Sequence, residues 1–455
     1  MATMLESLFT YAYLAVLYFL EGIPYGVQDK LLPQHLRAQR FSYSGLTLSR
    51  VLLVPWLCKP LFASFIEKRW TQKRWIQLFL AVMTAVTWLS SYFGERVWPF
   101  ILTLFVLNVV SASFDVSVDT VALDVLQRSQ LSLGSAVQVG SYKVGAIFGG
   151  GVLFLLQLMA GVKGILRGMS VAYALGLVIV TFRSGSDART SRRTEPEEGE
   201  EETAQDENKS SASAGDADSQ SSEGLRRRKV QSEKVQNGAE SKSQVDTDGT
   251  APPEQLLGKM KWAISVEGTL GLVLFMMFYK AGEYGILTTY PSFLLDRGYS
   301  YFVVGLLNGG LGQFMSIMGS IIAGYMARGA RSQKNLLWKL CVARLLPAVL
   351  ICITNTRLFG RPKNVYFGVT GMLMLNLIGG MITTVVFTMA MASSQKLQRG
   401  FRSTHFSFLC TMEVLGKLAA SILVGPCIDF VGKTPTYFVM TALTALSIST
   451  TRFLK

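Results

Sequence analysis

Residues 98–120, WPFILTLFVLNVVSASFDVSVDT, form one apolar block. A helix needs about 20 such residues to cross the hydrocarbon core of a bilayer. Asp115 and Asp119 are the only charged side chains in the block. The block therefore predicts a membrane-spanning helix that carries two carboxylates.

Apolar blocks of similar length recur along the chain of 455 residues, which is 50% hydrophobic and only 16% charged. In soluble proteins about a quarter of the residues are charged. The twelve blocks cover residues 8–28, 46–66, 75–93, 98–120, 135–160, 164–182, 263–287, 301–327, 336–354, 365–392, 403–427 and 435–451. We expect an all-α membrane protein with twelve transmembrane helices, six in an N-terminal half (residues 1–182) and six in a C-terminal half (residues 263–455).

The segment between the halves, residues 183–262, has a different composition. It contains 13 Lys and Arg, 17 Asp and Glu and many Ser residues. Such a segment has too little apolar surface to bury a core, so we predict a disordered cytoplasmic linker. A basic run at 226–229 makes Ser232 a candidate kinase site, although a plain solvated linker is the favoured interpretation.

The basic residues predict the orientation in the membrane. An even number of spans places both termini on the same side. Four basic residues directly follow the second block, namely Lys68, Arg69, Lys73 and Arg74. Basic residues beside the end of a span favour the cytoplasmic side. We therefore expect a multi-pass membrane protein whose termini and linker are cytoplasmic.

The two halves also share a short sequence pattern. Tyr25-Gly26, Pro33 and Phe41-Ser42-Tyr43 recur as Tyr284-Gly285, Pro291 and Tyr299-Ser300-Tyr301, at an offset of 258 or 259 residues. Both sets follow the first span of their half. Repeated halves of six helices are typical of transporters that bind a solute between the halves.

Ionisable side chains inside membrane spans are expected to have a function or a charged partner, because each costs about 2.5–3.5 kcal/mol to insert. Asp115 and Asp119 lie four residues apart and so share one helix face. Two unpaired carboxylates at this spacing favour the retention of a proton. The alternative is that they accept hydrogen bonds or pair with Lys143 or Arg50. The candidates for proton coupling are Asp115, Asp119, Glu21 and Glu283.

A second set of polar residues is predicted to bind a solute. Lys59 lies in a segment between Pro55 and Pro60, which is expected to kink and to present the ammonium group to an anionic solute. The full set of candidates is Arg50, Trp56, Lys59, Tyr25, Gln138, Tyr142, Lys143, Lys280, Tyr284 and His405.

Proline and glycine residues predict local backbone features. Pro24 is expected to break the first helix beside Glu21, which would free backbone carbonyls at a cavity. Gly145 and Gly149 form a small-residue face that is predicted to serve helix packing.

Charged residues in the C-terminal half are expected to behave in two ways. Lys280 with Glu283, and Glu413 with Lys417, stand three and four residues apart and are predicted to form ion pairs. Lys339 and Arg344 lie near a span end, so they are predicted to extend towards the membrane surface.

Signatures of enzymes and cofactor sites are missing from the sequence. Gly432-Lys433-Thr434 resembles the end of a phosphate-binding loop, but Cys427 stands where the first glycine is required. The five cysteines show no metal-binding spacing. We expect no enzymatic activity, no cofactor, no metal and no nucleic-acid partner. The expected partners are a small anionic solute and the lipid bilayer.

Four motifs together resemble a known family. They are Glu21–Gln28, Pro55–Lys59, the Asp115–Asp119 pair with Ala122-Leu123, and Ser403–Phe406. They resemble the acetyl-coenzyme A transporter and AmpG muropeptide permease branch of the major facilitator superfamily. The resemblance implies a solute transporter for an acetyl-coenzyme A-like or other anionic solute, with proton coupling as a further expectation.

Charge supports an anionic solute, because outside the linker the chain has an excess of about 18 positive charges. A peptide-like or sugar-peptide solute would suit the same residues. Two other classes of protein stay open. One is a receptor or scaffold that has a transporter fold and signals through the linker. The other is a membrane acyltransferase that uses His405 with Asp124.

The first prediction concerns the linker. Asn208-Lys209-Ser210 is a glycosylation sequon, and a cytoplasmic linker never meets the lumenal enzyme that would modify it. We expect Asn208 to carry no glycan in a eukaryotic host, as judged by gel mobility with and without glycosidase. A glycan at Asn208 would invert the predicted orientation.

Overall fold

The computed structural model describes residues 2–28, 32, 49–93, 96–191, 263–354 and 364–454. Within these ranges the chain is almost entirely helical. The predicted linker from residue 192 to 262 lies outside the described residues, as do Pro33 and residues 41–43 of the repeat. The disorder of the linker therefore stays a prediction.

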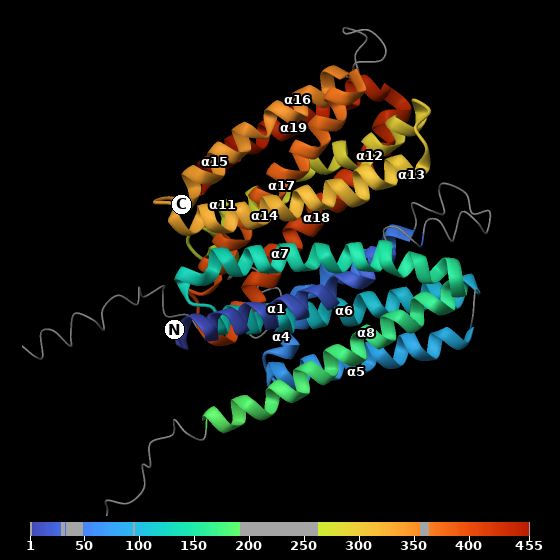
Figure 1. Ribbon diagram of the computed structural model, residues 1–455. Helices are drawn as coiled ribbons and strands as arrows, with labels where there is room; N and C mark the ends of the chain where they lie inside the picture. Colours follow the sequence, from blue (N-terminus) through green and yellow to red (C-terminus); the bar gives the residue numbers. More distant parts are fainter. Residues whose placement is uncertain are drawn as a thin grey trace, which may run out of the picture. The chain divides into compact units, whose positions relative to one another are not determined.

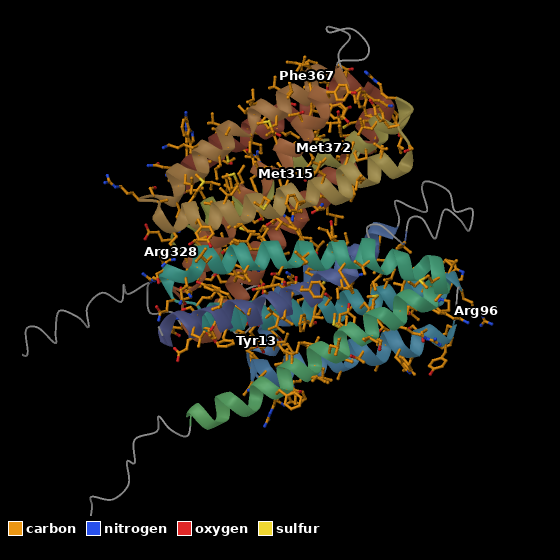
Figure 2. The ribbon with its side chains drawn as sticks, in the orientation of Figure 1. Tyr13, Arg96, Met315, Arg328, Phe367 and Met372 are labelled. Atoms are coloured by element: carbon orange, nitrogen blue, oxygen red, sulfur yellow. The ribbon has the colours of Figure 1, made fainter. Side chains whose placement is uncertain are left out.

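The N-terminal half follows the first six apolar blocks (Figure 1). Its helices are α1 (Ala2–Gly26), the 3₁₀ helix η2 (Ser49–Cys58), α4 (Lys59–Ile66), α5 (Gln72–Ser90), η3 (Ser91–Phe93), α6 (Val97–Val125), η4 (Arg128–Gln130), α7 (Leu131–Ile147), the π-helical η5 (Phe148–Val152) and α8 (Leu153–Ser191). Non-helical backbone at Ala160 and Gly161 divides α8, so the fifth and sixth blocks form separate helical arms. Arg96, just before α6, lies at an end of this half in Figure 2.

The C-terminal half follows the last six blocks in the same way. Its helices are α11 (Thr269–Phe278), α12 (Ala281–Asp296), α13 (Tyr301–Gly305), the π-helical η6 (Leu306–Leu311), α14 (Gly312–Gly329), α15 (Gln333–Ala343), α16 (Leu345–Thr354), α17 (Asn364–Ser394), α18 (Arg399–Val431), α19 (Lys433–Thr450) and η8 (Thr451–Phe453). Short irregular steps at Lys280 and Arg344 separate α11 from α12 and α15 from α16.

Nine helical segments in the described ranges are long and apolar enough to cross a membrane. The other three predicted spans are also helical. They correspond to η2 with α4, to α7 with η5, and to α19. The predicted all-α membrane fold is therefore confirmed, with a helical segment for each of the twelve blocks.

The first helix differs from its prediction. The expected break at Pro24 is wrong, because α1 stays helical through Pro24 to Gly26. A proline removes one hydrogen bond, to the carbonyl four residues earlier, and the helix accommodates this loss, with Val27 and Gln28 continuing as π-helix. The glycines on either side of Pro24 serve packing instead.

Glycines allow α1 and α7 to approach each other at backbone distance. A Cβ atom on Gly22 would lie 2.0 Å from the carbonyl oxygen of Tyr142. On Gly145 it would lie 2.0 Å from the carbonyl oxygen of Phe19, and on Gly149 it would lie 2.2 Å from that of Ile23. The predicted packing role of Gly145 and Gly149 is confirmed.

A group of hydrogen bonds between the halves lies where α6 and α17 end and α18 begins. The carboxylate of Glu67 accepts hydrogen bonds from the Ser403 backbone N–H at 3.0 Å and the Thr404 hydroxyl at 2.7 Å. The Thr120 hydroxyl donates to the Ser403 hydroxyl at 2.6 Å. Gln395 donates to two backbone carbonyls at the end of α6. These polar bonds hold the halves together at one end of their helices.

The second prediction tests the helix packing. Gly145→Ala places a methyl group against the α1 backbone, and overpacking of this kind costs about 1–3 kcal/mol. We expect a lower melting temperature for the purified protein. Gly151→Ala is the matched control, since no atom lies within 4 Å of the Cβ position at Gly151. Equal melting temperatures for the two variants would contradict the close α1–α7 contact.

Candidate functional site

An ion pair between Lys59 and Asp115 lies at the centre of the N-terminal half. Lys59 begins α4 and Asp115 lies on α6, and the ammonium nitrogen contacts the carboxylate directly. The two residues are only 5% and 3% exposed. The Lys59 nitrogen also lies 4.7 Å from the centre of the Trp56 ring, a distance at which the ring face attracts a cation.

Two further carboxylates lie beside this pair. Asp119 Oδ1 accepts hydrogen bonds from the Tyr18 hydroxyl at 2.9 Å and the Gln138 amide at 2.8 Å. Asp119 Oδ2 and Glu21 Oε2 are buried and have no hydrogen-bond partner among the residues that the structure describes. Glu21 lies within electrostatic range of Asp115, Asp119 and Lys59. We call Glu21, Lys59, Asp115 and Asp119 the acidic cluster.

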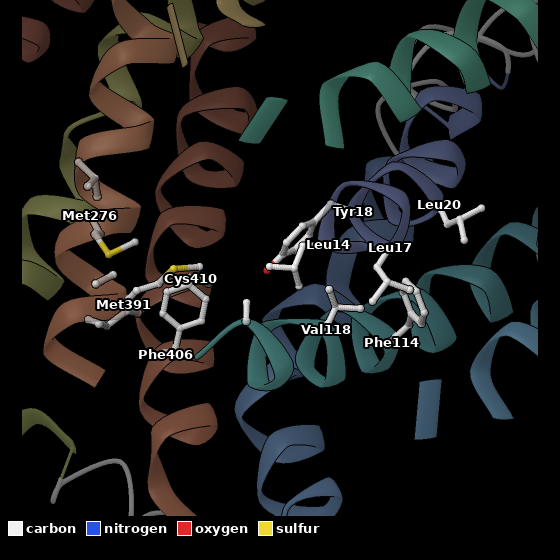
Figure 3. Packing of buried hydrophobic residues seen from close by; sticks show 14 of the residues in the cluster. Leu14, Leu17, Tyr18, Leu20, Phe114, Val118, Met276, Met391, Phe406 and Cys410 are labelled. Carbon is white, nitrogen blue, oxygen red and sulfur yellow. The ribbon is translucent and has the colours of Figure 1, made fainter. Parts of the chain in front are cut away.

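The acidic cluster contains three carboxylates and one cation, an excess of two acidic groups. Asp115 pairs with Lys59, a partner that the sequence analysis did not predict. Asp119 accepts hydrogen bonds from neighbouring helices, as the alternative interpretation expected. Apolar side chains surround the cluster. Figure 3 shows Leu14, Leu17 and Tyr18 of α1 facing Phe114 and Val118 of α6.

A chain of hydrogen bonds fixes Trp56 beside the cluster. The indole nitrogen of Trp56 donates to Asn108 Oδ1 at 2.9 Å, and the Asn108 amide donates to Gln28 Oε1 at 2.6 Å. These three residues come from η2, α6 and the end of α1. The ring that faces Lys59 is therefore held from two other helices.

A second cluster of charges lies mainly in the C-terminal half. Glu283, on α12, contacts Arg344 at 3.0 Å and Lys280 at 3.8 Å. Glu413 and Lys417, one turn apart on α18, form a direct ion pair. The predicted Lys280–Glu283 and Glu413–Lys417 pairs are confirmed.

Lys143 joins these groups from α7 of the N-terminal half. It lies within electrostatic range of Lys280, Glu283, Glu413 and Lys417. We call these five residues with Arg344 the basic cluster. It contains four basic and two acidic residues, an excess of two basic residues.

The position of Arg344 corrects one prediction. Arg344 was expected to extend towards the membrane surface, but its side chain is completely buried. Besides Glu283, it donates to the Ser447 hydroxyl of α19 at 2.6 Å. The irregular step between α15 and α16 turns Arg344 inward, where Glu283 balances its charge.

The remaining predicted residues occupy different places. Tyr25 and Tyr142 contact each other with ring centres 5.7 Å apart. Tyr284 follows Glu283 on α12 and is half-buried. Arg50 lies in η2, and its side chain is outside the described part of the structure.

His405 belongs to neither cluster. It is fully buried, and its two ring nitrogens contact the hydroxyls of Ser394 at 2.8 Å and Thr269 at 3.0 Å. Asp124 is exposed and contacts Arg402 at 3.7 Å. The pair of His405 with Asp124 that an acyltransferase would need is therefore not formed.

Comparison with known proteins identifies the family. The family model described as Major Facilitator Superfamily matches residues 14–404. The chain belongs to the Major Facilitator Superfamily.

Solved structures of other superfamily members share the fold. The transporter FucP in its outward conformation gives a TM-score of 0.64 at 13% identity, covering 98% of this chain and 99% of FucP. The proton:xylose symporter XylE gives 0.64 at 10% identity over 96% of this chain and 94% of XylE. The human organic anion transporter MFSD10 gives 0.63 at 12% identity, covering 97% of this chain and 98% of MFSD10.

Several residues that contact the two clusters were not predicted from the sequence. Tyr18 was not predicted, although it stands three residues before Glu21 on α1 and so shares its face. Asn108 and Ser316 gave no signal beyond being polar residues in apolar blocks.

The third prediction concerns the buried ion pair. Asp115→Asn removes the one carboxylate that contacts the buried Lys59 ammonium directly, and loss of one partner of a buried pair costs about 3–5 kcal/mol. We expect a clear fall in melting temperature. Asp124→Asn is the control, because its ion pair is exposed and such pairs contribute about 0–1 kcal/mol. Similar melting temperatures for the two variants would contradict a buried, paired Lys59.

Proposed function

We propose that the protein is a secondary active transporter that moves a small anionic solute across a membrane together with protons. The observation that carries the proposal is the presence of two buried ionic clusters with opposite excess charge, the acidic cluster in the N-terminal half and the basic cluster mainly in the C-terminal half. Uncompensated charges in a membrane protein mark the path of a solute or a proton.

Accessibility supports the basic cluster as the solute site. The side chains of Lys417 and Lys280 are 32% and 13% exposed, so neither ammonium group is sealed inside the protein. An excess of basic over acidic residues favours a ligand with negative charge, and phosphate or carboxylate groups bind lysine and arginine through strong charge-assisted hydrogen bonds.

The acidic cluster suits a proton better than a solute. Glu21 and Asp119 are 3% and 1% exposed, which leaves no surface for a larger ligand. Asp115 and Glu283 already have cationic partners. Of the four predicted candidates, Glu21 and Asp119 are therefore the ones we propose to take the proton.

Lys59 has a conditional role in this proposal. Its charge is balanced by Asp115 while that carboxylate is ionised. Protonation of Glu21 or Asp119 would reduce the negative charge around this ammonium group while its contact with Asp115 stays. We propose that the charge balance around Lys59 changes when the acidic cluster binds a proton. The solute itself contacts the basic cluster.

Alternating access supplies the transport step. In this fold the two halves rock around a site between them. The Glu67, Thr120 and Gln395 hydrogen bonds hold one end together, so these bonds must break for that end to open. With both termini in the cytoplasm, the closed end is the cytoplasmic one.

The substrate class rests on the motifs of the sequence. They resemble the acetyl-coenzyme A transporter and AmpG branch, and within it major facilitator superfamily domain-containing protein 3. A coenzyme A ester carries several negative charges, which suits the basic cluster. We therefore propose an acetyl-coenzyme A-like anion as the solute, carried without chemical change.

The fourth prediction separates proton coupling from binding. Asp119→Asn mimics a permanently protonated carboxylate at nearly equal volume. In proteoliposomes we expect wild-type protein to accumulate labelled acetyl-coenzyme A under an imposed pH gradient, and the variant to lose this accumulation. Counterflow without a gradient needs no net proton movement and should persist.

Two outcomes would reject the coupling. Wild-type transport that ignores the pH gradient would point to an exchanger or facilitator. Normal accumulation by Asp119→Asn would leave the acidic cluster with a structural role only.

A further inference from the structure

Lys143 is the one member of the basic cluster that comes from the N-terminal half, and its contacts set it apart from the others. Its ammonium nitrogen donates a hydrogen bond to the hydroxyl of Ser316 on α14. Among the described residues, no carboxylate forms an ion pair with it. Both carboxylates of the cluster are already engaged, Glu283 by Lys280 and Arg344, and Glu413 by Lys417.

The charged groups that face Lys143 are two lysines and two carboxylates, and each carboxylate already contacts another cation. Lys280 precedes α12 and Lys417 lies on α18, each with its nearby carboxylate, Glu283 or Glu413. On α1, which packs against α7, the titratable groups nearest in sequence to Gly22, the residue that approaches Tyr142, are Glu21 and Tyr25. Glu21 interacts with the acidic cluster and Tyr25 contacts the Tyr142 ring. On α14 the partner is the neutral Ser316.

These surroundings make the protonation of Lys143 depend on whether an anion is bound beside it. A third positive charge beside two lysines, inside the protein, is opposed by repulsion and by the loss of hydration. A negative group bound between Lys143, Lys280 and Lys417 reverses the balance, because it attracts an ammonium group. Arg344 and the two other lysines differ from Lys143 in that each has a carboxylate in contact.

We propose that Lys143 takes up a proton from water when an anion binds to the basic cluster, so that the two bind as a linked pair. The inference rests on the anion site of the proposed function and goes further, because it places a coupled proton on a lysine outside the acidic cluster. The proton binds the lone pair of the Lys143 nitrogen to give an ammonium ion. It returns to water when the anion leaves, and no bond of the solute is made or broken.

Linkage gives the proposal a direct measurement. Sulfate is the probe, because it keeps its two negative charges near neutral pH and cannot exchange protons itself. Binding of sulfate to the purified full-length protein is followed by calorimetry in two buffers that differ in their heat of ionisation. The difference in heat gives the number of protons taken up. Potassium chloride at equal ionic strength corrects for salt effects.

Three variants separate the roles of charge and titration. Wild-type protein and Lys339→Arg, which alters an exposed lysine of α15, should take up protons, approaching about one per sulfate. Lys143→Arg should keep sulfate binding but lose the proton uptake, because a guanidinium group is always charged. Lys143→Met should lose the uptake and bind sulfate about tenfold more weakly, the loss expected for one charge-assisted contact.

The outcomes that overturn the inference differ from those that overturn the transport proposal. Unchanged proton uptake in Lys143→Arg would place the proton on another group. Failure of sulfate to bind to wild-type protein would remove the anion site itself. By contrast, linked uptake at Lys143 without any solute accumulation in proteoliposomes would reject the transport function and leave the lysine chemistry in place.

Discussion

The ion pair between Lys59 and Asp115 is the constraint on which the arrangement of the N-terminal half depends. A buried ammonium group requires a counter-charge, so α4 and α6 must keep Lys59 and Asp115 in contact. Trp56, Tyr18 and Gln138 then complete the cluster from three other helical segments. Because α4 and α6 also contact α18, this cluster lies beside a contact between the two halves.

In the proposed transport cycle, the two clusters would have different tasks. Carboxylates sealed from water can exchange only a proton, whereas the partly exposed lysines can meet a dissolved anion. Lys143 connects the two halves, because it extends from α7 to Ser316 on α14 while it lies among the charges of α12 and α18. Binding of an anion there would affect both halves together, which is what alternation between two states requires.

Much of this architecture could be predicted from local sequence. The apolar blocks gave the spans, and four-residue spacing gave the shared face of Asp115 and Asp119, because these patterns involve neighbours along one helix. The Lys59–Asp115 and Glu283–Arg344 pairs were not predicted, since each joins separate helices whose contacts no local pattern encodes. Arg344 was misplaced for the same reason. At Pro24, the helix continues despite the loss of one hydrogen bond, which a rule based on a single residue does not anticipate.

The central claim is that the basic cluster binds a negatively charged solute. The most direct test measures the melting temperature of the purified protein with individual fractions of a metabolite extract, separated by charge. A ligand that binds only the folded state raises this temperature. The account predicts that anionic fractions raise it for wild-type protein and that Lys417→Met abolishes most of the shift. Stabilisation by neutral or cationic fractions alone, or an unchanged shift in Lys417→Met, would contradict it.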